Sequence, residues 1–222
     1  MDDFTKRTQA EDTLGTRKKK SVITDPRSVT LSKLDIAAEH IRAAVRLFFE
    51  DAHPAPIYLL AASAREITQA IGDKLGVRTI LTNVAEDHGV SRKELIDDAH
   101  RYAGFMKHAD RKPNSEIELS YSFVEMVLQI ACHDFGRVAG GMPIEAQVYE
   151  AWIFATVTEK ISAAPLNRQR AIKRAIAKFP GVRSADVVTR RKIGREALET
   201  ALKDPSLQMK FRRTIDSQPP CR

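Results

Sequence analysis

Apolar residues along most of this chain recur every three or four positions, which is the spacing of one face of an α-helix. Such stripes run through residues 34–48, 57–75 and 123–135. No stretch keeps the two-residue alternation of a half-buried strand for long enough to argue for a sheet. The pattern therefore predicts an all-α fold.

Prolines, glycines and capping residues divide the stripes into separate predicted helices. Pro54 suits the first turn of the second helix, and Gly76 suits the position just after its end. Ser91 and Ser115 each precede a glutamate by three positions, which is the sequence form of a capping box and predicts a helix start. Residues 77–90 show no clear pattern.

The C-terminal part of the chain predicts two further helices that are less apolar. Asn167 is placed to cap the first and Ser184 to cap the second, which we expect to end near Pro205. Short connections favour antiparallel neighbours, so five amphipathic helices form an antiparallel bundle with a basic helical extension, and we place a boundary near Pro165. The predicted parts are a flexible basic arm at 1–30, the bundle at 31–164, the basic extension at 165–204 and a flexible tail at 205–222.

Composition narrows the class of protein. The 222 residues are 43% hydrophobic and 29% charged, as in ordinary globular domains. No run reaches 18 apolar residues, and the first residues lack the apolar segment of a secretory signal, so we expect a cytoplasmic protein without a membrane span. Cys132 and Cys221 form no C-x-x-C pair, which fits a reducing compartment.

Net charge is distributed very unevenly along the chain. The whole sequence carries +7, but residues 1–30 carry +2, residues 31–150 carry −5 and residues 151–222 carry +10. A basic third behind an acidic body is typical of a protein that meets a polyanion. Two alternatives stay open: the basic segment docks on the acidic body of its own or a second copy, or it serves solubility alone.

The leading hypothesis is a non-catalytic binding or regulatory protein that contacts RNA or DNA through the basic C-terminal third. Phosphate contact without sequence readout is favoured, because only Phe179 and Phe211 are present after Pro165 to stack on bases. A homo-oligomeric interaction module is an alternative. The candidate nucleic-acid-binding residues are Arg168, Arg170, Lys173, Arg174 and Lys178 on the first basic helix, and Arg190, Arg191, Lys192 and Arg195 on the second.

A polar column on the predicted helix that begins after Ser91 and runs towards Pro113 supports an enzymatic alternative. Arg101 and His108 are seven positions apart, which places them on one helical face together with Asp97. Such a histidine is suited to take the proton of a ribose 2′-hydroxyl while the arginine stabilises the phosphate. The structural alternative is an exposed Asp97–Arg101 ion pair, with His108 stabilised by the helix dipole.

Familiar cofactor and metal motifs do not occur in the sequence. It contains no P-loop, no G-x-G-x-x-G, no G-x-S-x-G and no H-E-x-x-H. The spacing E-x-x-H occurs once, from Glu50 to His53, where a di-iron bundle needs two. We therefore expect neither a metal site nor a cofactor.

The end of the predicted helix that begins after Ser91 resembles a family signature. Residues 105–111 (FMKHADR), followed by Pro113, resemble the F-F-K-H-A-D-R-x-P signature of a family of helical bacterial proteins of uncharacterised activity. The resemblance covers roughly residues 34–155 and implies a helical bacterial protein without a particular activity. The R-x6-H spacing of Arg101 and His108 is more distantly similar to HEPN (higher eukaryote and prokaryote nucleotide-binding) bundles. That similarity implies a metal-independent ribonuclease or toxin.

Overall fold

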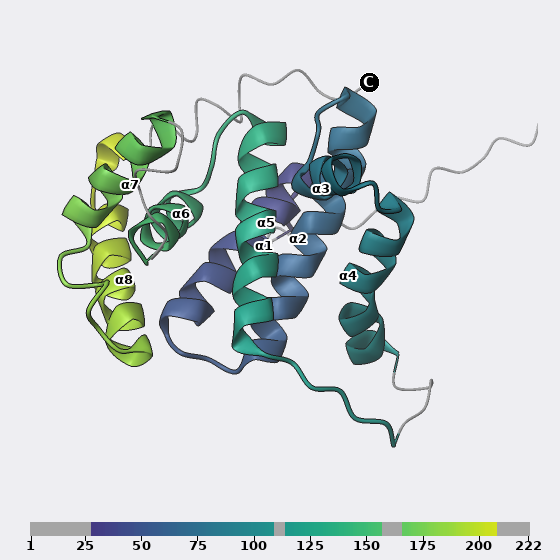
Figure 1. Ribbon diagram of the computed structural model, residues 1–222, viewed down its shortest axis with the longest axis horizontal. Helices are drawn as coiled ribbons and strands as arrows, with labels where there is room; N and C mark the ends of the chain where they lie inside the picture. The colour runs from purple at the N-terminus through teal and green to yellow at the C-terminus, as the bar shows by residue number, and fades with distance from the viewer. Residues whose placement is uncertain (1–27, 109–113, 157–165, 208–222) are drawn as a thin grey trace, which may run out of the picture. The chain divides into compact units, whose positions relative to one another are not determined.

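A computed structural model describes residues 28–108, 114–156 and 166–207, apart from the side chains of three residues, Asp98, Asn167 and Arg168. The chain divides into two compact units, Met1–Thr30 and Leu31–Arg222, and every helix described below belongs to the second. Over the described residues the secondary structure is helical without strands, which confirms the all-α prediction (Figure 1). In chain order the helices are α1 (Lys33–Phe49), α2 (Pro54–Leu75), α3 (Ile80–His88), α4 (Arg92–Lys107), α5 (Tyr121–Ala139), α6 (Ile144–Thr156), α7 (Leu166–Lys178) and α8 (Val187–Leu202).

Three of the predicted helix boundaries are confirmed by local geometry. Helix α2 has Pro54 at its first position and ends at Gly76, whose φ of 68° is left-handed. Helix α4 is capped by Ser91, whose side chain accepts a hydrogen bond from the backbone N–H of Glu94. These residues act through backbone preferences that need no tertiary contact, so the sequence alone predicts them.

Three predicted caps are wrong, because residues with capping side chains are more frequent than helix ends. Helix α5 is capped by Ser120 rather than Ser115, and the chain before it has no helical structure from residue 115. Helix α8 is capped by Asp186 rather than Ser184, and it ends at Leu202, short of the expected end. Asn167 lies within α7, which begins one residue earlier.

The segment between α2 and α4 contains a helix that the sequence pattern does not indicate. Residues 77–90 include α3, so the described part of 31–164 holds six helices rather than five. Helix α3 buries only Leu81 and Ala85 and ends at Gly89, where φ is 62°. Two buried positions on nine residues are too few to stand out as an amphipathic stripe.

The core lies between α1, α2 and α5, and α6 packs across α1 and α5 (Figure 1). The stripes predicted on α1 and α5 face this core, with Ile41, Phe48, Leu128 and Phe135 fully buried. Burial of each such side chain stabilises the fold by roughly 1.5–3 kcal/mol. Rings of Phe48 and Trp152, with centres 5.4 Å apart, join the end of α1 to α6 edge to face.

One pair of neighbouring helices departs from the expected antiparallel arrangement. Helices α2 and α5 run parallel, because Tyr58 stacks on Phe123 near both helix starts and Gly72 lies against Val138 near both ends. Helices α3 and α4 and the segment after them return the chain to the start of α5. Short connections predict antiparallel packing only between helices that are consecutive in sequence, and α2 and α5 are not.

Helices α7 and α8 are part of the same compact unit as the core. Both pack on α6, and α8 also packs on α1. The indole N–H of Trp152 donates to the carbonyl oxygen of Arg190 at 2.9 Å, and a methyl group at Gly194 would collide with the ring of Phe49. The residues on the two sides of the expected boundary near Pro165, which itself lies outside the described residues, are therefore packed together rather than separate.

Candidate nucleic-acid interface

Helix α7 concentrates positive charge on its solvent side. Its thirteen residues include five basic residues and no acidic one. Arg170, Lys173, Arg174 and Lys178 are exposed, whereas Ile172 is buried against the rest of the protein. Spacings of three and four residues keep the four cations on one side of the helix. We call these four residues the α7 basic face.

The α7 basic face is not neutralised by the described part of the protein. Within the described residues, none of its four side chains forms an ion pair or hydrogen bond with another group. From Arg170 to Lys178 the face extends about 12 Å along the helix axis, taking a rise of 1.5 Å per residue. Duplex DNA carries one phosphate charge per roughly 1.7 Å of its axis, so a face of this length meets several phosphates.

Arg191, one of the predicted nucleic-acid-binding residues, is a core residue in the structure. Its side chain is only 5% exposed and forms ion pairs with Asp51 and Glu125. Its guanidinium also lies over two aromatic rings, 4.8 Å from the centre of Phe48 and 4.7 Å from that of Tyr121. Because these groups already engage and cover it, Arg191 does not belong to a surface that contacts phosphate.

The other candidates on α8 lie in a surface of mixed charge. Arg190 is half-buried and its Nη2 donates to the carbonyl oxygen of Arg183 at 3.0 Å. Lys192 and Arg195 are exposed, but the ammonium of Lys192 lies 4.0 Å from the carboxylate of Glu196. Helix α8 therefore does not repeat the unbroken positive face of α7.

Some basic candidates fall outside the part of the chain that the structure describes. The backbone of Arg168 is placed in α7, but its side chain is not described. The predicted flexible arm at 1–30 lies outside the described residues up to position 27, and the predicted tail at 205–222 does so from position 208. The α7 basic face is thus the part of the predicted interface that geometry supports.

Arg101 lies on α4, whereas His108 is the residue after its last helical position, and both side chains are exposed. The Nη2 of Arg101 lies 3.3 Å from the hydroxyl of Tyr102, and its guanidinium is 5.1 Å from the centre of that ring. His108 follows the last helical residue, and its backbone N–H donates to the carbonyl oxygen of Gly104. Across the described residues no hydrogen bond joins Arg101 to His108.

Among the described residues, the side chains form neither a reactive thiol nor a metal centre. Cys132 is fully buried, and burial raises the pKa of its thiol well above the ordinary value. Within the same residues, no three His, Cys, Asp or Glu side chains lie close enough to hold a metal ion. None of the described helices is both long and apolar enough to cross a membrane.

Two histidines are expected to titrate on opposite sides of pH 6.5. A hydrogen bond to Glu150 raises the pKa of His133, although burial acts the other way, while burial followed by the charge of Lys107 lowers the pKa of His40. NMR titration of the imidazole protons should give a midpoint above pH 6.5 for His133 and below it for His40. The charge of Asp134 raises the pKa of His133 and the charge of Arg137 lowers it, so neither residue is changed in this experiment.

The direction of the His133 pKa shift determines how the stability of the fold depends on pH. A raised pKa in the folded state means that the stabilisation is complete below about pH 6.5 and is lost as pH rises through the folded-state value. The variant Glu150→Gln should return the midpoint of His133 towards its ordinary value. A midpoint that stays raised in Glu150→Gln would show that another group causes the shift.

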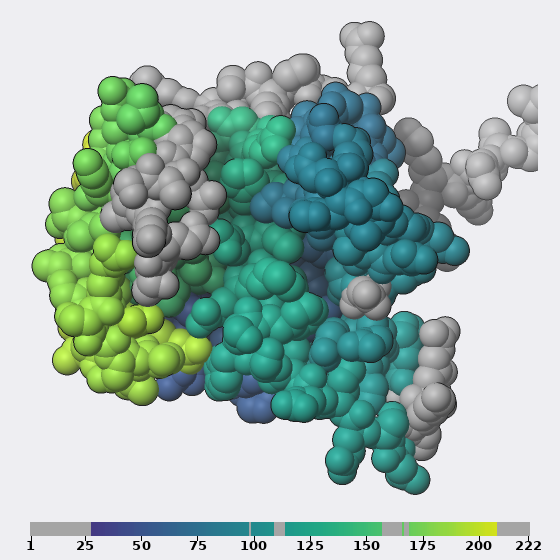
Figure 2. Space-filling model, in the orientation of Figure 1, coloured from purple at the N-terminus to yellow at the C-terminus, as the bar shows by residue number. Residues whose placement is uncertain are grey.

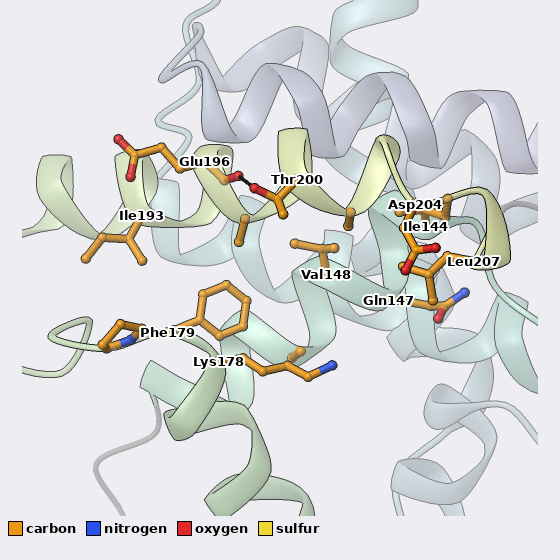
Figure 3. A pocket seen from close by; sticks show the side chains of 14 residues that line it. Ile144, Gln147, Val148, Lys178, Phe179, Ile193, Glu196, Thr200, Asp204 and Leu207 are labelled. Atoms are coloured by element: carbon orange, nitrogen blue, oxygen red, sulfur yellow. Dashed lines mark hydrogen bonds between the residues drawn. The ribbon is translucent and has the colours of Figure 1, made fainter.

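A groove on the α6–α8 side is a surface feature that the sequence pattern does not indicate. It has a volume of about 680 Å³ and is lined by α6, by the end of α7 and by α8 (Figure 3). Lys178 lines it as well as belonging to the α7 basic face. The lining comes from three separate segments, so no local spacing in the sequence could have revealed it.

Comparison of the chain with protein-family models, with curated proteins and with solved structures gives no match. The resemblances of residues 34–155 to a helical bacterial family and of Arg101 and His108 to HEPN bundles therefore stay predictions. Part of the signature, residues 109–113, lies outside the described residues.

Proposed function

We propose that this protein binds nucleic acid through the α7 basic face, by contact with phosphates and without catalysis. The observation that carries the proposal is a helix face with four exposed cations and no acidic residue, in a chain whose middle part is acidic. Phosphate contact supplies affinity that does not depend on sequence, through the release of counterions from the nucleic acid. The other helices hold α7 in position for this binding function.

Recognition of bases has little support on this surface. Sequence readout needs side chains in a groove, and binding to single strands needs exposed aromatic rings for stacking. Helix α7 has no aromatic residue, and Phe179, which follows it, is 3% exposed. The connection from α7 to α8 spans eight residues, 179–186, whereas a helix-turn-helix motif has three or four.

A charge-matched pair of variants tests the proposal. In the α7 variant, Arg170, Lys173 and Arg174 are replaced by glutamine, and in the control Lys192, Arg195 and Lys203 of the α8 region are replaced in the same way. Fluorescence anisotropy with labelled duplex DNA and structured RNA, in EDTA, gives Kd from 50 to 200 mM salt. The α7 variant should bind at least about tenfold more weakly at 50 mM salt, and its log–log salt slope should fall by about 2.7.

The α8 control separates a binding face from a general effect of charge. Both variants lower the net charge of the protein by three, and all six residues are exposed in the structure. The control should keep its Kd within about threefold of the wild type and keep the salt slope. An equal loss in both variants, or no binding by the wild type, would contradict the proposal. Substitution is preferable to removal of residues 165–222, because α8 packs on the core.

Two companion measurements, of RNA length and of protein mass, separate the proposal from the two alternatives. Shortened RNA in EDTA, lost in His108→Ala, would replace binding by the ribonuclease hypothesis of Arg101 and His108. A mass that changes with salt in light scattering, without a bound nucleic acid, would favour the homo-oligomeric module. Intact nucleic acid and weakened binding in the α7 variant alone would support phosphate contact.

A further inference from the structure

The groove beside the α7 basic face has the dimensions of a small-molecule site. Its volume of about 680 Å³ lies within the range of roughly 300–1,000 Å³ that is usual for ligand pockets. Val148 of α6, Phe179 after α7, and Ile193 and Ala197 of α8 give it apolar walls (Figure 3). Burial of an apolar body against these walls would supply most of the binding free energy.

The groove exists because α6 keeps its two neighbours apart. Helices α7 and α8 each pack on α6, and the connection between them carries Phe179 and Val182, which are 3% and 1% exposed. These two anchors fix the end of α7 beside α6, so the groove is built on helices that pack into the core. A site on such a support is formed before its ligand arrives.

Most polar groups at the groove already have partners. The hydroxyl of Thr200 donates to the carbonyl oxygen of Glu196, and the side-chain amide of Gln147 donates to the carbonyl oxygen of Met142. Glu196 also lies beside the ammonium of Lys192, and its carboxylate points away from the groove in Figure 3. Asp204 accepts a hydrogen bond from the backbone N–H of Ser206. These groups therefore have partners within the protein and do not need a hydrogen bond from a ligand.

Lys178 differs from the other charged groups that line the groove. Its side chain runs along the groove below Val148 in Figure 3, and among the described residues its ammonium has neither a hydrogen bond nor an ion pair. An ammonium beside an apolar wall attracts an anionic group whose apolar part lies against that wall. A carboxylate is the smallest common group that meets this requirement.

We propose that the groove between α6, the end of α7 and α8 binds a free small molecule with an apolar body and one carboxylate. The apolar body lies along Val148, Phe179 and Ala197, and the carboxylate accepts hydrogen bonds from the ammonium of Lys178. This inference goes beyond nucleic-acid binding and does not depend on it, because Lys178 is the only member of the α7 basic face at the site.

Calorimetric titration of the full-length protein with dodecanoate, below its micelle concentration, tests the proposal. Dodecanoate should bind one to one, while dodecyltrimethylammonium, with a similar apolar chain and the opposite charge, should bind at least tenfold more weakly. Lys178→Gln should weaken dodecanoate binding about tenfold or more, the usual effect of losing a hydrogen bond to a charged group. Lys173→Gln, with the same charge change on the same helix away from the groove, should stay within twofold.

A second variant tests the position of the apolar body. Ala197→Phe places a ring into the groove and should abolish binding while the far-UV circular dichroism stays unchanged. Equal effects of Lys178→Gln and Lys173→Gln, tighter binding of the cationic chain, or full binding by a folded Ala197→Phe would each overturn the proposal. Loss of nucleic-acid binding in the α7 variant tests a different surface, so the two proposals fail separately.

Discussion

Replacing Arg191 with methionine is expected to lower the free energy of unfolding by about 3 kcal/mol, the low end of the range for breaking a buried ion pair. The substitution removes ion pairs to Asp51 and Glu125. It also removes the stacking of the guanidinium on Phe48 and Tyr121. These contacts join α8 to the end of α1 and the start of α5, so their loss loosens the attachment of the whole helix.

The low end of that range follows from the exposure of the two acidic partners. The Asp51 side chain is 52% exposed and that of Glu125 is 32% exposed, so water solvates part of each carboxylate after the arginine is gone. Methionine fills much of the space of the arginine stem and leaves only a small cavity. The cost therefore comes mainly from lost charge and ring contacts.

Urea unfolding and thermal unfolding at pH 7, each followed by far-UV circular dichroism, measure the effect on stability. The melting temperature should fall by about 6–12 °C, taking 2–4 °C per kcal/mol for a chain of this size. Lys192→Met is the matched control, since Lys192 is the next residue and its side chain is 64% exposed. The control should change stability by less than about 0.5 kcal/mol. A loss below 1 kcal/mol in Arg191→Met would show that α8 is held by other contacts.

The sequence predicts the positions of the helices along the chain better than it predicts which helices pack against one another. The stripes on α1 and α5 have the helical period, and residues such as Val45 and Phe135 are buried as expected. Local preferences of Pro54 and Gly76 fix the ends of α2. The parallel packing of α2 and α5 could not be predicted in this way, because it depends on contacts between residues more than fifty positions apart.

Helix α2 shows where an apolar stripe is an incomplete guide. The stripe through 57–75 predicts one buried face, yet Arg65, Thr68 and Gln69 are also buried, while Leu75 is 51% exposed. The helix packs against α1, α4 and α5, so most of its circumference is covered. A pattern that assigns polar residues to solvent cannot predict burial on several sides.

The candidate interface was predictable only in part, for a related reason. A count of basic residues treats Arg174 and Arg191 alike, but the first is exposed and the second is held by acidic and aromatic side chains from α1, α5 and the α1–α2 connection. The absence of acidic residues from α7 is a local property that sequence can show. The groove of Val148, Phe179 and Ala197 is not, since it needs the packing of α7 and α8 on α6.

The same substitution at a second buried arginine is expected to have the opposite effect. Arg65 is 1% exposed, and none of its three guanidinium nitrogens has a hydrogen-bond partner within the described residues. Burial lowers the pKa of this guanidinium, and the charges of Glu66 and Asp134 only partly oppose that effect. Arg65→Met removes an uncompensated desolvation cost and keeps the packing of the stem, so stability should rise by about 1–3 kcal/mol.

The contrast between Arg65→Met and Arg191→Met isolates the role of partners, since residue type, burial and replacement are the same at both sites. Asp134 limits the gain, because Arg65 helps to lower the pKa of that carboxyl against the raising effect of burial. Unfolding of Arg65→Met at pH 5 and pH 7 measures this, and the gain should be larger at pH 5, where Asp134 is more readily protonated. A loss of stability at both pH values would mean that partners in solution satisfy the Arg65 guanidinium, and its charge would then stabilise the junction of α2 and α5.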